Sequence, residues 1–297
     1  MKKILIVAAF AGLLSGCSDN KSAADAYGNF EATDVIVSAE ASGKLLDFEV
    51  QEGDSAAAGE IVGLIDTTML NLQKKELDSQ REVLQSQLTA AQAQIAMAQQ
   101  KLENTRLDLS RVQKMVLDDA ATQKQLDDLE AAEKVMQKQV DAARAQANAV
   151  SAQIKALKAR AALLDEQLLR CRIVNPLNGI VLKKYVEAFE MTAAGKPLYK
   201  IADLSSMILK VYVSGGQLHN LNLGKTCTVR IDDGKKFIEF PGRITWISSQ
   251  AEFTPKIIQT KEERVDLVYA VKINVQNDGA IKIGMPGEVL FDSAGTK

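Results

Sequence analysis

The sequence TTMLNLQKKELDSQREVLQSQLTAAQAQIAMAQQKL (67–102) contains no glycine, no proline and no aromatic residue. It belongs to a longer stretch, 64–178, that has no glycine and only one proline, Pro176. Glycine and proline are the residues that most disfavour the interior of a helix. The stretch therefore predicts extended α-helix, which we place at residues 67–170.

Within this region, apolar residues recur at intervals of three and four. The first half has two rows: Leu70, Leu77, Leu84, Ala91, Ala98, Thr105 and Val112, and Lys74, Arg81, Leu88, Ile95, Leu102, Leu109 and Val116. The second half has one series with a lapse at Glu133: Leu126, Leu129, Met136, Val140, Ala143, Ala147, Val150, Ile154, Leu157, Ala161, Leu164 and Leu168. Such spacing is typical of coiled coils. The halves are nearly equal and a short turn at about 117–122 joins them, so we expect an antiparallel hairpin with arms of about 70 Å.

The segments on either side of the helical region repeat one short pattern. The first copy carries Gly43, Val50, Gly53, Asp54, Ala57, Ala58, Gly59 and Ile65, and the second carries Gly179, Val186, Phe189, Glu190, Ala193, Ala194, Gly195 and Ile201. Every pair has the same separation, which indicates an internal repeat. Each copy reads as strand, turn, strand. We expect the copies, within 28–66 and 171–203, to pack face to face as a small β-sandwich.

Short runs of β-branched and aromatic residues follow Asp203. They are Met207–Val213, Cys227–Ile231, Phe237–Phe240, Ile244–Ile247, Leu267–Val275 and Glu288–Phe291. Turn signals, including Ser214-Gly215-Gly216 and Asp233-Gly234, separate them. We expect a small antiparallel β-barrel at 204–297, completed by a strand near Gly28 to Val35. The predicted fold class is α+β.

The N-terminus has the features of a lipoprotein signal. Two lysines precede a short apolar run, and Leu14-Ser15-Gly16-Cys17 closes it. The run is too short to span a membrane. We therefore expect a signal peptide at 1–16, lipid attachment at Cys17, a flexible tether at 17–27, and a periplasmic chain. The alternative is an ordinary signal peptide followed by an incidental cysteine.

Composition argues against several other functions. A net charge of −2 and a pI near 5.7 disfavour nucleic acid as a partner. Cys171 and Cys227 lie in different regions, and we expect buried free thiols, with a disulfide as the alternative. His219 is the only histidine and has no Cys or carboxylate cluster around it in the sequence. We expect no metal, no cofactor and no enzymatic activity.

The flanking repeats resemble lipoyl or biotinyl half-motifs. The order of half-motif, long hairpin, half-motif and β-rich tail resembles the HlyD family of membrane fusion proteins, also called periplasmic adaptor proteins. The resemblance runs from about Tyr27 to the C-terminus and implies an elongated multidomain adaptor with a split lipoyl-like sandwich. One departure is Phe189, where the repeat and the family have glycine. Either the second turn is built differently, or Phe189 is simply exposed or packed on a neighbour.

The turn of the hairpin resembles the tip motif of that family. Arg111, Met115 and Thr122 stand at the spacing of its Arg, Leu and Ser. The resemblance implies that these three residues dock onto a TolC-like outer-membrane channel. Each has a plainer explanation: Thr122 and Gln125 match a capping box, Met115 can cover the end of the coiled coil, and Arg111 can be a solvated surface residue.

The resemblance implies a ring of several subunits, with six as the expected number, between an inner-membrane exporter and that channel. The chain ends soon after its last predicted strand, which favours an ABC-type exporter over an RND or MFS partner. The alternatives are a lipoate or biotin carrier and a lipid-anchored structural tether. A carrier needs an acceptor lysine in the turn between the half-motifs, where Ile65-Asp66-Thr67-Thr68 leads into a helix instead. Ser18 leaves open whether the lipid is kept at the inner or the outer membrane.

Overall fold

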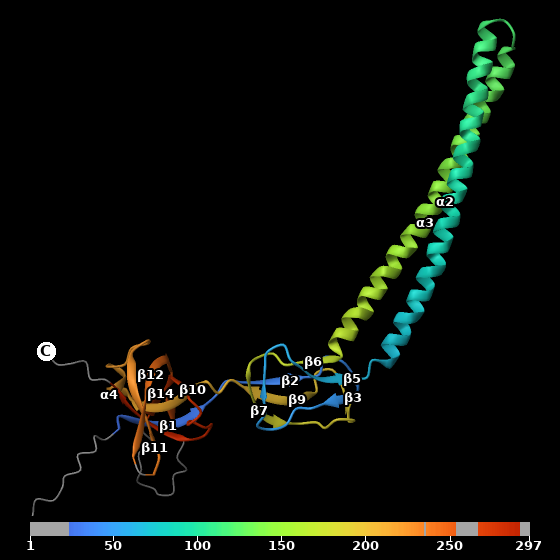
Figure 1. The fold of residues 1–297 in the computed structure, drawn as a ribbon. Coiled ribbons are helices and arrows are strands. Elements are labelled where there is room, and N and C mark those ends of the chain that lie inside the picture. Colours follow the sequence, from blue (N-terminus) through green and yellow to red (C-terminus); the bar gives the residue numbers. More distant parts are fainter. Residues whose placement is uncertain (1–23, 235, 254–266, 292–297) are drawn as a thin grey trace, which may run out of the picture. The chain divides into compact units, whose positions relative to one another are not determined.

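The computed structural model describes residues 24–234, 236–253 and 267–291. They form two compact units, which we describe separately. One contains the helical hairpin and most of the sandwich, and the other contains the β-barrel (Figure 1). The predicted α+β class, with these three parts, is confirmed.

The sandwich interleaves the two copies of the repeat. The first copy supplies β2 (Asp34–Ser38), β3 (Gly43–Phe48), β4 (Ser55–Ala56) and β5 (Ile61–Ile65), and the second supplies β6 (Arg172–Val174), β7 (Gly179–Lys184), β8 (Met191–Thr192) and β9 (Pro197–Ala202). One sheet has the order β2-β9-β7-β4 and the other β6-β5-β3-β8. Both sheets therefore contain strands of both copies, so neither copy can complete a sheet alone.

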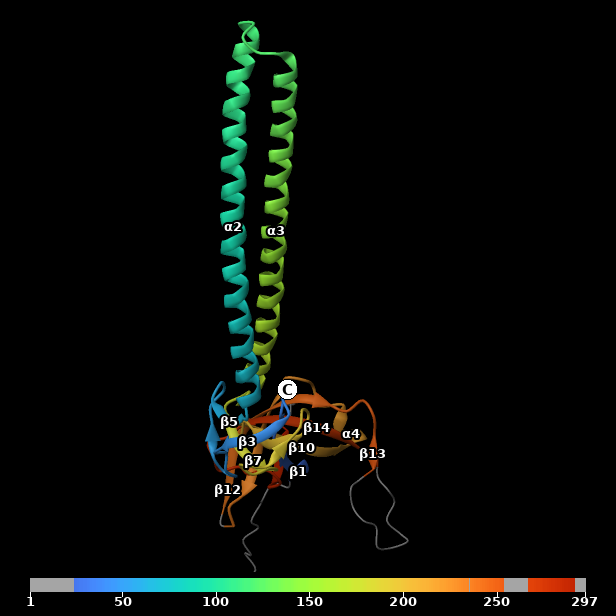
Figure 2. The ribbon, with the colours of Figure 1, turned by 90° about the vertical axis from the view of Figure 1, so that its right-hand side faces the viewer.

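The hairpin leaves the sandwich from two neighbouring strands. Helix α2 (Thr68–Leu117) follows β5, and α3 (Gln123–Arg170) leads directly into β6. Strands β5 and β6 pair antiparallel, with Leu64 opposite Arg172. Paired strands lie about 4.8 Å apart, so the two helices start as close neighbours. Figures 1 and 2 show them running side by side from there to the tip.

The heptad rows form the contact between α2 and α3. The most buried positions are Ala91 and Leu102 on α2 and Val140, Ala147, Val150, Ile154 and Leu157 on α3. The lapse at Glu133 lies in this contact as well, where its carboxylate is 2.9 Å from Nε of Arg106. Lys74, in a predicted row, pairs across the hairpin with Asp165 at 2.6 Å. The predicted coiled coil is thus confirmed. Two charged positions of its rows, Lys74 and Glu133, carry ion pairs between the arms, whereas Arg81 pairs with Asp78 of its own helix.

A buried tyrosine joins the sandwich core to a turn. Tyr199 is fully buried, and its hydroxyl donates to Oδ1 of Asn175 at 2.9 Å. The Asn175 amide in turn donates to the carbonyl of Ala57 at 2.9 Å. Burial, with a smaller contribution from the nearby Glu60 carboxylate, raises the pKa of Tyr199 to about 12. The neutral form is therefore the one that the fold accommodates.

This pKa predicts a loss of stability at high pH. The unfolded tyrosine releases its proton near pH 10, and the folded one near pH 12. Between these values the unfolded state binds fewer protons, so the free energy of unfolding should fall by about 1.4 kcal/mol per pH unit. Urea unfolding at pH 9, 10, 11 and 12 measures the slope. Tyr199→Phe should lower the free energy of unfolding by about 1 kcal/mol at neutral pH, because a buried hydrogen bond is lost. Above pH 10 it should flatten the slope of this free energy against pH. An unchanged slope would contradict the raised pKa of Tyr199.

The second turn of the repeat keeps the backbone of the first. Phe189 has φ +72°, close to the +94° of its counterpart Gly53. Its N–H donates to the Leu45 carbonyl at 2.7 Å, its ring is 68% exposed, and the Lys44 ammonium lies 5.4 Å from the ring centre. The exposed alternative was correct, and the idea of a differently built turn was wrong. The hydrogen bond to Leu45 holds Phe189 at a positive φ, a backbone conformation whose strain is about 1–2 kcal/mol for an aromatic residue.

The strain at Phe189 can be measured with two variants. At an ordinary exposed position valine is as stable as glycine or more so, because glycine loses more backbone entropy on folding. At φ +72° a β-branched residue clashes with its own backbone. We therefore expect Phe189→Gly to be more stable than Phe189→Val by about 1–2 kcal/mol in urea unfolding. The opposite order would show that the turn has relaxed in solution.

The second unit is a closed six-stranded barrel. Its order is β10 (Ser206–Ser214), β1 (Ala26–Glu31), β15 (Pro286–Phe291), β11 (Thr226–Asp232), β12 (Phe237–Ile247) and β14 (Leu267–Gln276), closed by pairing of β10 with β14. β13 (Glu252–Phe253) adds to β14. Alternate residues, such as Phe30, Leu209 and Ile273, fill the interior. The predicted barrel is confirmed. Its N-terminal strand is β1, which ends at Glu31, whereas Asp34 and Val35 belong to β2 of the sandwich.

Two local predictions in the barrel were wrong. Residues 237–247 form one strand and not two, with a bulge between Ile244 and Trp246. Pro241 lies just outside the pairing with β14, where a missing N–H removes no bond from that ladder. The turn expected at Ser214-Gly215-Gly216 is a short helix, α4 (Gly215–Leu218), because Ser214 and Gln217 form a capping box.

Candidate functional site

The hairpin tip is a tight turn closed by its own backbone. The Asp118 N–H donates to the Lys114 carbonyl at 3.2 Å, and the Ala120 N–H donates to the Met115 carbonyl at 2.7 Å. Asp119 has φ +55°, a conformation that aspartate tolerates better than most residues. These bonds fix the direction in which the end of α2 presents its side chains.

Thr122 is fully used as a helix cap. Its hydroxyl accepts the Gln125 N–H at 3.3 Å, and the Gln125 side-chain carbonyl accepts the Thr122 N–H at 2.9 Å. The structure therefore contains the capping box that the sequence predicted. The Thr122 side chain remains exposed, so a docking role stays a prediction beside the structural one.

Arg111 and Met115 are both exposed on the last turns of α2. The Arg111 side chain is 73% exposed, and its guanidinium lies 3.1 Å from a carboxylate oxygen of Asp108. An exposed pair of this kind contributes about 0–1 kcal/mol, so the guanidinium can exchange partners at little cost. Met115 is 45% exposed. The structure thus brings the three predicted residues to one end of the hairpin, with only Thr122 fully engaged in the fold.

Leu117 is a tip residue that the sequence analysis missed. It is the last residue of α2 and is 85% exposed, the highest value among the large apolar residues in the described ranges. Its position outside both heptad rows was the available signal, because an apolar residue off the contact face of a coiled coil must face solvent. Met115 and Leu117 give the tip two exposed apolar side chains beside the cations Arg111 and Lys114. Such a surface can bind another protein.

No cluster of three His, Cys, Asp or Glu residues in the described ranges is placed to bind a metal ion. Cys171 and Cys227 are buried and are not joined in a disulfide, as predicted. Burial also raises the pKa of the Cys171 thiol, which makes it a poor nucleophile. The predicted lipid site, Cys17, lies outside the described residues. In the ranges described, none of the helices combines the length and the apolar character that crossing a bilayer requires.

Comparison with known proteins agrees with this picture. No family model matches the chain. A UPF0194 membrane protein of Acidithiobacillus ferridurans is 27% identical over 290 residues, which cover 88% of this chain and 84% of that protein. The UPF0194 membrane protein YbhG of Salmonella gallinarum is 32% identical over 121 residues, covering 40% of this chain and 36% of YbhG. The match to YbhG thus spans about a third of that relative's length.

Among solved structures, MacA from Actinobacillus actinomycetemcomitans aligns with a TM-score of 0.57 and 21% identity. The alignment covers 89% of this chain and 76% of MacA, which is a periplasmic adaptor protein. The chain has the membrane fusion protein fold. The resemblance to the HlyD family is therefore confirmed at the level of the fold. In this chain the hairpin lies between the two halves of the sandwich and is held at its base by the β5–β6 pairing.

Proposed function

We propose that this chain is a periplasmic adaptor of an efflux or secretion system. The observation that carries the proposal is the two-helix insert, which leaves paired strands of a split sandwich and ends in an exposed tip. A carrier domain would have a short lysine turn at that place in the sandwich. The chain catalyses nothing in this proposal, and transport energy comes from a partner.

The proposed assembly is a ring, with six subunits as the working number. The lipid at Cys17 holds the chain at the inner membrane, the barrels meet the exporter, and the sandwiches form a collar. The hairpins bundle into a tube whose tips meet a TolC-like outer-membrane channel through Arg111, Met115 and Thr122. Leu117 joins this docking surface because of its exposure. Mass spectrometry of the mature N-terminus tests the lipid, since an unmodified or absent Cys17 would exclude it.

The inner-membrane partner in this proposal is an ABC-type exporter, in preference to an RND or MFS transporter. Its support is the length of the hairpin, with helices of 50 and 48 residues. A second candidate function is a lipid-anchored structural tether of the cell envelope. A tether also uses a long coiled coil, but it gives no reason for exposed Met115 and Leu117 beside Arg111 at the tip.

Crosslinking at the tip separates the two functions. We would place single cysteines at Met115 and Leu117 in the full chain, with Cys171→Ala and Cys227→Ala removing the buried thiols. Thr122 is avoided because losing its cap costs about 1 kcal/mol. Lys138→Cys, on the shaft and 84% exposed at its side chain, is the control. Capture of a TolC-like channel by the tip cysteines alone is expected. Capture of only sister subunits, or of nothing, by an abundant protein would favour the tether.

A further inference from the structure

A hollow of about 740 Å³ lies on the outer face of the β-barrel, beside the start of β1. Its volume is in the range of sites that hold small molecules, about 300–1,000 Å³. Strands β1, β10, β11, β14 and β15 contribute to its walls. We call this hollow the barrel trough. Its charged and aromatic lining residues are Asp25, Tyr27, Tyr212, Arg230, Asp232 and Glu288.

Two tyrosines stand side by side in the barrel trough. Tyr27 of β1 is the cross-strand partner of Tyr212 of β10. Directly opposed residues of antiparallel strands have Cβ atoms about 4.5–5.5 Å apart. Both tyrosines point outward, because their neighbours Ala26 and Val213 belong to the barrel core. Tyr27 is 59% exposed. The trough therefore offers two adjacent aromatic side chains, a surface that attracts cations and apolar groups.

Tyr212 already stabilises one cation of the protein. The Lys210 ammonium lies 5.3 Å from the centre of the Tyr212 ring. Lys210 is not among the lining residues, and its charge is offset by the Glu252 carboxylate, 3.6 Å away. The Tyr212 ring is thus placed where positive charge is favoured, and the pair of Lys210 and Glu252 adds no net charge beside the trough.

The lining of the trough carries more negative than positive charge. Arg230 is the one cation among the described lining residues, against the three carboxylates of Asp25, Asp232 and Glu288. The Arg230 guanidinium is engaged in the fold: it lies 3.1 Å from a Glu288 oxygen and 4.8 Å from the centre of the Phe237 ring. Only 9% of its side chain is exposed. Arg230 and Glu288 therefore offset each other, and the two aspartates give the lining its negative charge.

Both aspartates are held in place by the backbone. One Asp25 oxygen accepts the Phe291 N–H at 2.8 Å, and one Asp232 oxygen accepts the Gly234 N–H at 2.7 Å. Within the described residues, the second oxygen of each aspartate makes no hydrogen bond. A side chain that is already fixed loses less conformational entropy when it binds a ligand. The two carboxylates are thus prepared to meet a cation.

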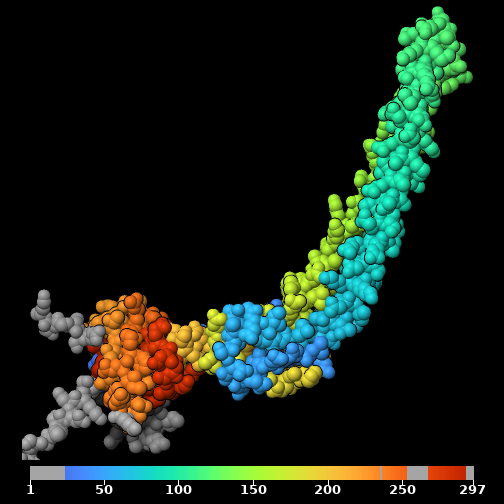
Figure 3. Space-filling view, in the orientation of Figure 1, coloured from blue at the N-terminus to red at the C-terminus, as the bar shows by residue number. Residues whose placement is uncertain are grey.

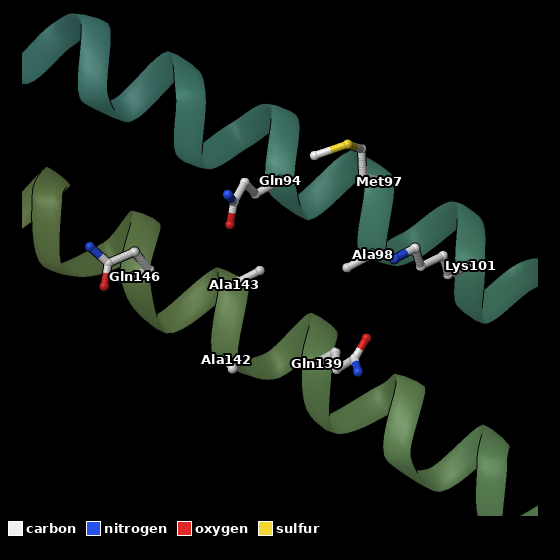
Figure 4. A pocket seen from close by; sticks show the side chains of 8 residues that line it. All are labelled: Gln94, Met97, Ala98, Lys101, Gln139, Ala142, Ala143 and Gln146. Carbon is white, nitrogen blue, oxygen red and sulfur yellow. The ribbon is translucent and has the colours of Figure 1, made fainter.

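The hollow between the two helices has a different character. It has a volume of about 480 Å³ and is lined by the side chains that Figure 4 labels. Lys101 is the only charged residue among them, and none of them is aromatic. The hairpin is narrow (Figure 3), and Met97 in this lining is 60% exposed. This hollow is therefore shallow and offers no group that would hold a cation.

We propose that the barrel trough binds a hydrophobic organic cation, with its charge near the two aspartates and its apolar groups against Tyr27 and Tyr212. Aromatic faces are the surfaces that recognise quaternary ammonium groups, and nearby carboxylates add electrostatic attraction. Because the charge of such an ion is spread over a large apolar group, its desolvation costs less than that of a small ion. Val268 and Pro286 add apolar surface to the walls. A ligand of this class fits the trough in size, charge and apolar character.

We assign this cation to the cargo of the proposed adaptor. Cys17 and Asp25 are eight residues apart in the sequence. A lipid at Cys17 therefore keeps Asp25 within about 28 Å of the attachment point, whatever path the chain takes. Amphiphilic cations concentrate at a membrane surface, because their apolar groups enter the headgroup region. The cargo assignment rests on the proposed function and on its lipid, whereas binding in the trough does not.

Calorimetric titration of the purified full chain with tetraphenylphosphonium tests the site. Tetraphenylborate, in sodium buffer, has the same shape and the opposite charge, and it should not bind. Asp25→Asn/Asp232→Asn should weaken tetraphenylphosphonium binding about tenfold or more, because attraction by two carboxylates is lost. Both asparagines keep the oxygen that accepts the backbone N–H, so the fold should be unchanged. Equal binding of the two ions would overturn the proposal.

A matched control removes two carboxylates elsewhere. Asp47→Asn/Asp203→Asn changes two exposed residues that do not line the trough. Its affinity for tetraphenylphosphonium should equal that of the unaltered chain. Tyr27→Leu keeps an apolar side chain but removes an aromatic face, and it should weaken binding as well. If Asp25→Asn/Asp232→Asn binds as tightly as the control, the trough is not the site.

Accumulation of tetraphenylphosphonium in cells tests the cargo assignment separately. Asp25→Asn/Asp232→Asn should raise accumulation to the level of cells without the chain, while Met115→Cys in the same background still captures the channel. Binding with no effect on accumulation contradicts the cargo assignment and leaves the site. Absence of binding with channel capture contradicts the site and leaves the adaptor function. Binding without channel capture contradicts the adaptor function and leaves the site.

Discussion

Arg111→Asp should abolish docking to the outer-membrane channel, and with it export, while the chain stays folded. Its ion-pair partner in the fold is the exposed Asp108, at 3.1 Å, and exposed pairs of this kind contribute about 0–1 kcal/mol to the stability of the fold. When the tip is docked on the channel, the same change removes a charged donor and adds a carboxylate. This should weaken the free energy of binding by about 2–5 kcal/mol. Docking should weaken about 30-fold or more. The measurement is the yield of channel recovered with Met115→Cys in the presence and absence of Arg111→Asp.

Lys138→Asp is the matched control for this prediction. It makes the same change of charge on α3, at a side chain that is 84% exposed and paired only loosely, at 3.8 Å, with Asp141. Its channel yield should equal that of the unaltered chain. If Arg111→Asp recovers as much channel as the control at equal abundance, Arg111 has no docking role and the tip motif has only the structural explanation.

Val140→Asp should separate the two arms of the hairpin. Val140 is 1% exposed, the lowest value among the described residues of either helix, and the contact includes few other fully buried side chains. Burying a carboxylate there without a partner costs several kcal/mol, on the order of 3–5. The barrel and the sandwich have cores of their own and should remain folded. The helical circular dichroism signal should therefore fall strongly at 25 °C while the β-rich units still melt cooperatively.

The same lysine variant, Lys138→Asp, controls for adding an aspartate to α3 near this position. It should keep the full helical signal, since its side chain lies outside the contact. A Val140→Asp chain with an unchanged helical signal and melting curve would show that the hairpin tolerates charge in its centre. The coiled-coil contact would then not be what holds the arms together.

The architecture could be predicted from the sequence because many residues carry the same periodic or repeated signal, so one exception does not change the prediction. Twelve heptad positions on α3 all lie in or beside the contact, so an error at one of them would not have changed the conclusion. Even Glu133, the apparent lapse, proved consistent, because Arg106 on the other arm neutralises it. The matched spacing of the repeat likewise predicted a sandwich built from both copies.

Single-residue geometry was harder to predict. Phe189 adopts a glycine conformation because the turn and the Leu45 hydrogen bond impose it, and its identity gave no sign of this. The break expected between Phe240 and Ile244 does not occur, because Pro241 lies just outside the pairing of β12 with β14, which the sequence does not state. At the tip, the cap at Thr122 was predictable from two residues. The exposure of Leu117 was missed, although its position outside both heptad rows signalled it.

The attachment of the hairpin to two paired strands has a consequence for how such proteins vary. Strands β5 and β6 hold the base of the insert, and the tip is closed by bonds within its own turn. Neither the base nor the tip depends on the number of helical turns between them. Removing one heptad from each arm in register would shorten the reach by about 10 Å and leave both ends as they are. The insert is thus an adjustable spacer, whose length can follow the width of the compartment without redesign of its two ends.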